Sequence, residues 1–213
     1  MASRTKSTDD LGTRHIAAHP ELYTPSRDNN YVFYVHFKDR LLKAGVDADV
    51  ATDSNYFDAA QAQEVLALSV TQAAVPHYTQ TPIEVPRGNV VVKFAGAIKF
   101  DSGEFAFNDY IGAQTKDILM AWQRLSGDPL DQTVGEAEDY KMTATLIEYT
   151  PSHRQIRHWD FSGVWISGVS EGPLSSDSDG KRQVSATIHY DWAIPNEPED
   201  METVTFVSST TTE

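Results

Sequence analysis

The dominant pattern along this chain is a two-residue alternation of apolar and polar positions, which is typical of β-strands that bury one face. The clearest case covers residues 182–192, where the side chains expected to point inward are Val184, Ala186, Ile188, Tyr190 and Trp192. Shorter runs rich in aromatic and β-branched residues predict further strands. These runs cover residues 31–38, 64–71, 89–94, 104–107, 140–149 and 156–167.

One segment changes to helical spacing. Residues 115–125 are predicted to form a helix that begins at Thr115 and is stopped by Gly127 and Pro129. Its apolar stripe consists of Ile118, Leu119, Trp122 and Leu125. Residues 59–63 or 41–44 are the candidates for a second helix. Because long parallel crossovers are absent, the predicted fold class is mainly β, an antiparallel sandwich or barrel with one packed α-helix.

The chain divides into three parts. Residues 1–28 form an N-terminal arm with little apolar periodicity, and residues 194–213 form an acidic C-terminal tail without a basic residue. The β domain is expected between them, at residues 29–193, with an inserted segment at residues 39–63. Both ends are expected to become ordered only against a neighbour, because they have too few apolar residues to fold alone.

The composition narrows the classes of function. The 213 residues include no cysteine, which excludes disulfides, thiolate zinc sites and a cysteine nucleophile. The formal net charge of −14 argues against a protein that grips nucleic acid or anionic membranes through basic groups. The N-terminus lacks the apolar core of a signal peptide, and no apolar run approaches the roughly 20 residues of a spanning helix. We therefore expect a soluble protein made in the cytoplasm, without a membrane anchor.

No pattern predicts a catalytic, cofactor-binding or metal-binding residue. The seven histidines lack metal-ligand spacing, and no glycine-rich nucleotide-binding motif occurs. Residues 168–172 (GVSEG) approach a serine-nucleophile motif but lack its strand–turn–helix context, and residues 175–179 approach a calcium loop without its glycine and glutamate. The acids between residues 128 and 139 are interpreted as a solvated charge run, and His158 with Asp160 as a structural pair. The four tryptophans, Trp122, Trp159, Trp165 and Trp192, are all expected in the core.

Three stretches carry a resemblance through their order and spacing. Residues 87–127 are RGNVVVKFAGAIKFDSGEFAFNDYIGAQTKDILMAWQRLSG, residues 140–151 are YKMTATLIEYTP, and residues 157–175 are RHWDFSGVWISGVSEGPLS. A β pair, an acidic aromatic strand, a helix ending in Trp-Gln and a strand bearing Gly-x-Trp-Ile follow one another. Over residues 64–192 the chain resembles the tail tube (inner tube) protein of contractile-tailed bacteriophages.

The resemblance implies a structural virion protein. In that family six copies form a ring, neighbouring sheets join around a central channel, and rings stack inside a contractile sheath. DNA passes through the channel without specific binding. The expected partners are therefore further copies of this chain, a sheath protein, a tape-measure protein, and baseplate and terminator proteins. The expected location is the phage tail, after assembly in the host cytoplasm. A tail-associated, monomeric β-sandwich that binds or cleaves glycans stays open as the alternative, which exposed aromatics or convergent carboxylates would favour.

Two features of the assembly are expected from residue placement. Residues 71–88 hold three prolines between predicted strands, and we expect them to project from the ring and contact the next ring. The acids concentrate in residues 39–63, 126–139 and 169–180 rather than in the strands. We therefore expect a hydrophilic channel wall of Ser, Thr, Gln and His side chains, with acids mainly where loops reach its rim. Ser185, Thr187 and His189 are its expected representatives.

Overall fold

The computed structural model describes residues 27–43, 46, 51–129, 131–173 and 180–196. Nearly all of the predicted N-terminal arm lies outside these residues, as do most of the acidic tail and the calcium-like segment 175–179. The account of the fold below refers to the described residues.

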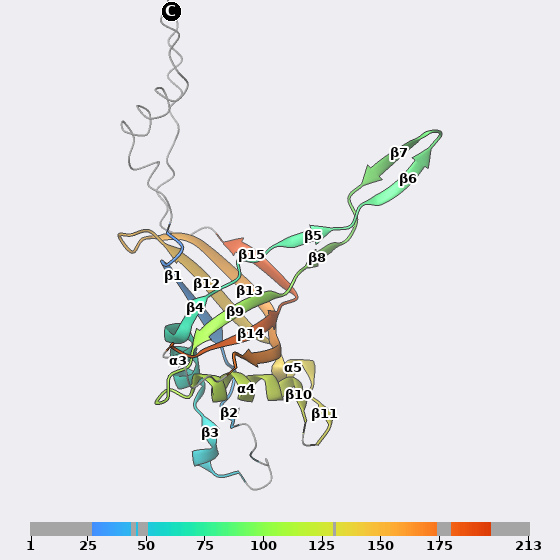
Figure 1. Ribbon diagram of the computed structural model, residues 1–213. Coiled ribbons are helices and arrows are strands. Elements are labelled where there is room, and N and C mark those ends of the chain that lie inside the picture. Colours follow the sequence, from blue (N-terminus) through green and yellow to red (C-terminus); the bar gives the residue numbers. More distant parts are fainter. Residues whose placement is uncertain (1–26, 44–45, 47–50, 130, 174–179, 197–213) are drawn as a thin grey trace, which may run out of the picture.

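A curled, antiparallel, seven-stranded sheet forms the body of the molecule (Figure 1). Its order is β1-β12-β13-β14-β9-β4, and β15 pairs with β13. The strands of this sheet are β1 (Tyr31–His36), β4 (Val70–Gln72), β9 (Gly103–Asn108), β12 (Met142–Tyr149), β13 (Gln155–Glu171), β14 (Gln183–His189) and β15 (Trp192–Asn196). The predicted class, mainly β and antiparallel, is confirmed, although the described residues form more than the one predicted helix.

Short strand pairs and helices complete the described elements. The pairs are β2 (Leu41–Leu42) with β3 (Tyr56–Phe57), β5 (Tyr78–Gln80) with β8 (Ile98–Phe100), β6 (Ile83–Arg87) with β7 (Val90–Phe94), and β10 (Gly127–Asp128) with β11 (Thr133–Val134). The helices are η2 (Asp53–Asn55), α3 (Ala59–Ser69), α4 (Thr115–Ser126) and α5 (Ala137–Tyr140). In this part of the chain no helix combines the length and the apolar character needed to cross a membrane.

The long strand β13 belongs to both layers of the sandwich. Residues 155–164 pair with β12, and part of this stretch also pairs with β15, while residues 165–171 pair with β14. Near the end of the first half lies Gly163, with φ +68°, where an added Cβ would lie 2.1 Å from Oδ2 of Asp191. Lys141 holds that carboxylate, with 2.7 Å between Nζ and Oδ2. Glycine at this bend is therefore required both by the backbone angle and by the close approach of Asp191.

The interruption between β14 and β15, which lies opposite Gly163, contradicts one prediction from the sequence. The alternation in β14 buries Val184, Ala186 and Ile188, as predicted. After Tyr190 the inward phase shifts by one residue, so Ala193 is buried and Trp192 is 45% exposed. The prediction that Trp192 points into the core is therefore wrong. The described fold also extends to Asn196 at the end of β15, three residues beyond the predicted boundary at Ala193.

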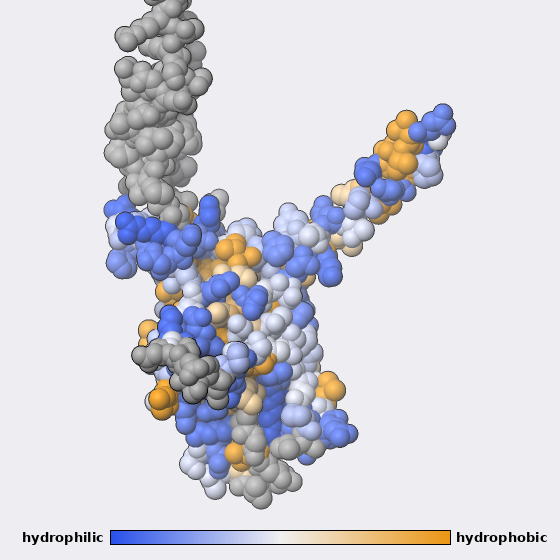
Figure 2. Space-filling view, in the orientation of Figure 1, coloured by the Kyte–Doolittle hydropathy of each residue, from blue (hydrophilic) through white to orange (hydrophobic). Residues whose placement is uncertain are grey.

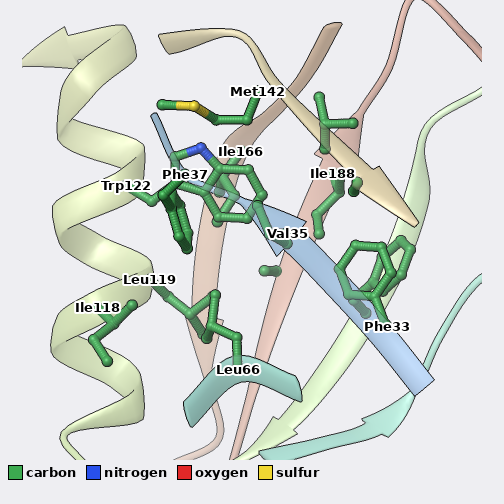
Figure 3. Packing of buried hydrophobic residues seen from close by; sticks show 14 of the residues in the cluster. Phe33, Val35, Phe37, Leu66, Ile118, Leu119, Trp122, Met142, Ile166 and Ile188 are labelled. Carbon is green, nitrogen blue, oxygen red and sulfur yellow. The ribbon is translucent and has the colours of Figure 1, made fainter. Parts of the chain in front are cut away.

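The core fills the space between the two layers and α4 (Figure 3). Phe33 of β1 meets Phe105 of β9 with ring centroids 4.6 Å apart, which links the layers at the centre. The helix α4 was predicted correctly, and its Trp122 is fully buried with its ring 5.3 Å from that of Phe37. The N-cap is Gln114 rather than Thr115, whose buried hydroxyl instead lies 3.1 Å from the hydroxyl of Ser69.

The prediction of a strand over residues 64–71 is wrong. These residues mostly belong to α3, which continues to Ser69, and only Val70–Gln72 forms strand β4. The face of α3 that points into the core carries Ala62, Leu66 and Ser69, at helical spacing. Because Ser69 is polar, the sequence of this helix does not show a complete apolar stripe. The predicted inserted segment, residues 39–63, also ends inside this helix.

Candidate assembly surfaces

A long hairpin leaves the body and carries apolar residues far from the core (Figures 1 and 2). It runs from Tyr78 to Phe100 through β5, β6, β7 and β8, with a two-residue turn at Gly88 and Asn89. We predicted a projection, but over residues 71–88 only. Residues 89–94 were expected as a strand of the domain, but Val90–Phe94 form the returning outer strand β7 of this hairpin.

The two faces of the outer hairpin differ in chemistry. Residues opposite one another across a hairpin share a face, so the pairing of β6 with β7 defines both faces. One face, named here the apolar hairpin face, consists of Ile83, Val85, Val90, Val92, Phe94 and Arg87. The other face carries Pro86, Val91 and the ion pair of Glu84 with Lys93, at 3.1 Å. Phe94 is 56% exposed and Val90 65% exposed, so the described protomer leaves the apolar hairpin face without a cover.

Aromatic contacts fix the base of the long hairpin to the body. The ring of Phe100 lies 5.7 Å from that of Tyr78 and 5.9 Å from that of Tyr190, which in turn packs on Phe161. Burial raises the pKa of Tyr190 above its ordinary value. Between the inner strand pair (β5 with β8) and the outer pair (β6 with β7), residues 81–82 oppose residues 95–97. Gly96 lies in the longer of these two stretches. A Cβ at Gly96 would lie 2.0 Å from the carbonyl oxygen of Thr81, so this elbow needs glycine.

The outer face of the layer formed by β4, β9, β14 and the second half of β13 is polar and nearly uncharged. The register places Ser185 between Ser170 and Ala106, and Thr187 between Gly168 and Glu104. Within these strands, Glu104 is the carboxylate on that face. The predicted channel residues Ser185, Thr187 and His189 therefore lie together on one face of one layer, with Gln183 and Asn108 beside them.

Hydrogen bonds order this polar face. Thr71 donates its hydroxyl to the Ala106 carbonyl at 3.0 Å. His189 lies with Nε2 3.0 Å from Oγ of Ser167, and its ring stacks on that of Trp165 with centroids 4.9 Å apart. Trp165 is therefore half-buried at the end of the polar face, whereas Trp159 is half-buried against the core. All four tryptophans were predicted in the core, and of these only Trp122 is fully buried.

The outer face of the other layer is less polar. On β15, Trp192 and Ile194 are about half exposed, and their cross-strand neighbours on β13 are Ser162 and Asp160. Asp160 also lies beside His158, with 2.9 Å between Oδ1 and Nε2. The predicted structural pair of His158 with Asp160 is confirmed.

The acids of the predicted solvated run are exposed at Asp131, Glu136, Glu138 and Asp139, and Asp128 is the exception. Asp128, interpreted as part of a solvated run, is a partner of Arg124, with 2.6 Å between Nε and Oδ2 and both side chains largely buried. Arg124 also donates to backbone carbonyls of Lys43 and Val46 and so ties the segment after β2 to α4. Another acid, Glu171 at the end of β13, pairs with Lys116 at 2.6 Å and with Arg182.

Residues considered for chemistry stay apart. Residues 168–172, which approached a serine-nucleophile motif, begin within the extended strand β13 rather than at a turn that opens a helix. Among the described residues, no group of three or more His, Asp or Glu side chains is placed to hold a metal ion. The distinctive features of this part of the chain are thus surfaces: the polar face and the apolar hairpin face.

The fold is shared with components of contractile injection systems. A chain of the anti-feeding prophage baseplate, six-fold symmetrised, matches with a TM-score of 0.53 at 10% identity, covering 81% of this chain and 95% of that one. A chain of the sheath–tube complex of an extracellular contractile injection system (PVC) in the extended state matches with a TM-score of 0.51 at 14% identity, covering 90% and 99%. The cap that terminates the anti-feeding prophage tube matches with a TM-score of 0.53 at 10% identity, covering 82% and 92%.

No family model and no curated protein matches the sequence. The structural likeness extends over nearly the whole length of the matched chains, at identities where only the backbone arrangement is comparable. The chain therefore has the tail-tube fold, that of structural components of contractile systems, as the sequence resemblance predicted.

Proposed function

We propose that this protein is the tube subunit of a contractile phage tail. Six copies form a ring, rings stack into a tube through the long hairpin, and DNA passes along the channel into the host. The observation that carries the proposal is the apolar hairpin face, which projects from the body and has no cover within the described protomer. A two-stranded hairpin is marginally stable on its own in water, so an apolar one needs a neighbour.

The polar face fits the wall of a channel for DNA. Each phosphate that a Lys or Arg neutralises adds affinity and would slow passage, so the wall must avoid basic groups. Serine, threonine, asparagine and glutamine hydrate well and carry no charge. With Glu104 as its carboxylate, the polar face offers DNA neither binding sites nor strong repulsion along the strands.

The fold likeness supports the assembly proposed. The similar chains come from a six-fold symmetrised baseplate, a sheath–tube complex and a tube-terminating cap. We accordingly propose a sheath protein outside the tube, a tape-measure protein inside it, and baseplate and terminator proteins at its ends. The role is structural rather than catalytic, the location is the virion tail after assembly in the host cytoplasm, and no membrane anchor takes part.

Light scattering during size exclusion, followed by negative-stain microscopy, tests this proposal. We expect species with six times the protomer mass and tubes of uniform diameter. Assembly should increase with salt, because the formal net charge of −14 on each copy is repelled by its neighbours until ions screen it. A protomer that stays monomeric at high concentration, over the whole range of salt, would contradict the proposal.

A further inference from the structure

We infer that the long hairpin of one protomer docks in a groove beside α3 of a second copy. The inference rests on the proposed function, in which rings stack through the hairpin, and it names the surface that receives it. This α3 groove has a volume of about 290 Å³. It is lined by Tyr34 of β1 and by Ala60, Gln63, Glu64, Ala67 and Leu68 of α3.

The α3 groove is a firm and mostly apolar surface. Leu68 is 73% exposed at its edge, although a leucine at such a position gains nothing from facing water. The opposite side of the helix is anchored, because Leu66 is fully buried and Ser69 bonds the first residue of α4 through its hydroxyl. The loop that leads into α4 carries Ile111, which is fully exposed.

The groove and the apolar hairpin face complement one another in charge. Five of the six residues on the hairpin face are apolar, and Arg87 is its one charged residue. The α3 groove has Glu64 as its one charged residue. Neither Arg87 nor Glu64 forms an ion pair with a residue that the structure describes. On the other hairpin face Glu84 and Lys93 already neutralise each other.

Two larger grooves on the described surface suit the hairpin less well. The groove of about 520 Å³ is lined by two arginines, Arg27 and Arg157, and by two carboxylates, Asp28 and Glu148, so its charges already balance and give Arg87 no net attraction. The groove of about 470 Å³ is lined mainly by charged residues, which are Lys38, Asp39, Arg40, Glu138 and Asp139. An apolar strand pair would remove the water that hydrates those charges and would offer no polar groups in its place.

The two surfaces lie on different sides of the protomer. In Figure 1 the long hairpin leaves the body at the upper right, and α3 lies on its left side. A contact between two different surfaces on opposite sides of a protomer is heterologous, so it repeats from copy to copy instead of closing a pair. Such a contact extends a tube, because every protomer that donates a hairpin still offers its own α3 groove.

Cross-linking in this cysteine-free chain tests the contact directly. A variant with Val92→Cys and Leu68→Cys, treated with a short bis-maleimide, should give a ladder of covalent multimers on denaturing gels. The matched control pairs Val92→Cys with Thr143→Cys, an exposed position on the outer face of β12, and should give no ladder. Equal ladders from both variants, or none from either, would overturn the inference.

A charge exchange tests the pairing of Arg87 with Glu64. Arg87→Glu and Glu64→Arg should each shorten tubes about tenfold or more, because the loss repeats at every subunit of a ring. The double variant should recover most of the wild-type length. Lys93→Glu, on the opposite hairpin face, should elongate like the wild type. Single variants that elongate normally, or a double variant no better than the singles, would contradict the pairing.

The results separate this inference from the proposed function. Tubes that form while Val92 cross-links elsewhere than to Leu68 would leave the proposed function standing and overturn the α3 groove as the receiving surface. A wild-type chain that forms no rings or tubes would contradict the proposed function. In that case the cross-link still decides the contact, since a hairpin that binds the α3 groove links successive protomers into multimers at high concentration.

Discussion

Strand β7 is the more apolar of two strands, with four apolar residues of five against three of seven in β14, yet it is the exposed one. All five residues of β7 (VVVKF) are exposed, whereas β14 (QVSATIH) buries Val184, Ala186 and Ile188. The difference lies in what stands opposite each strand. The apolar side of β14 faces the core between two layers, and β7 has only β6 beside it. A strand that is apolar but exposed thus points to a cover supplied by another molecule.

This contrast divides the energetics between the two regions. The sandwich supplies the stability of the protomer, because its core holds nearly all of the fully buried large side chains. The long hairpin adds little to that stability, and its exposed apolar area is available for association with another molecule. Substitutions in the two regions should therefore change different measurements, folding in one case and assembly in the other.

The largest effect is expected at the centre of the sandwich. Trp122→Ala should lower the free energy of unfolding by about 3–5 kcal/mol, since it removes a fully buried indole and leaves a cavity under α4. Urea denaturation followed by circular dichroism measures the loss. Trp192→Ala is the matched control, because that indole is 45% exposed, and it should cost about 1 kcal/mol or less. Equal losses from both variants would show that the core is not where the structure places it.

A smaller loss of stability is expected at the bend of β13. Gly163→Ala puts a methyl group against the Asp191 carboxylate and forces an L-residue to φ +68°, so it should cost about 1–3 kcal/mol. Gly168→Ala, in the same strand, meets no atom within 4 Å and serves as control. Both are compared by urea denaturation. A Gly163→Ala variant as stable as its control would mean that the two layers can join without this bend.

These residues also show how far the sequence predicts the fold. The alternation of β14 and the stripe of α4 were sufficient, because each buries its apolar side against the same chain. The start of α3 was a candidate helix at residues 59–63, but its second half was mistaken for a strand, because Ser69 occupies its buried side and is satisfied by Thr115, a partner 46 residues away. Trp192 was misplaced because the bulge at Gly163 shifts the phase, and a single strand does not reveal the register of its neighbour.

The candidate surfaces were predicted only in part, because some of them follow from local patterns and others from contacts between distant segments. Ser185, Thr187 and His189 were found from alternation alone, since a polar side opposite a buried side is a local pattern. The extent of the long hairpin was not, because β7 looks like a core strand until its surroundings are known. The receiving groove joins residues of α3 with Tyr34 of β1, and no local pattern brings these segments together.

A modest, pH-dependent effect is expected at the base of the hairpin. Burial raises the pKa of Tyr190 above its ordinary value of 10.0, so the folded state holds this proton more tightly than the unfolded state. The resulting stabilisation is complete below pH 10 and is lost as the pH rises through the folded-state pKa. The melting temperature of the wild type should therefore fall more steeply above pH 10 than that of Tyr190→Phe. Parallel curves for the two proteins would show that the Tyr190 hydroxyl is not held in a buried site.

The smallest effect on stability is expected where the largest loss of assembly should occur. Replacing residues 81–97 by Asn-Gly joins Gln80 to Ile98, which already face each other across the inner hairpin, through a two-residue turn. The free energy of unfolding should change by about 0.5 kcal/mol or less, because the removed segment contacts little of the body. Light scattering should still show rings, while microscopy should show no tubes. A loss of stability similar to that of Gly163→Ala would mean that the outer hairpin folds back on its own protomer. The apolar hairpin face would then already have its cover, and the contrast between β7 and β14 would no longer require a second copy.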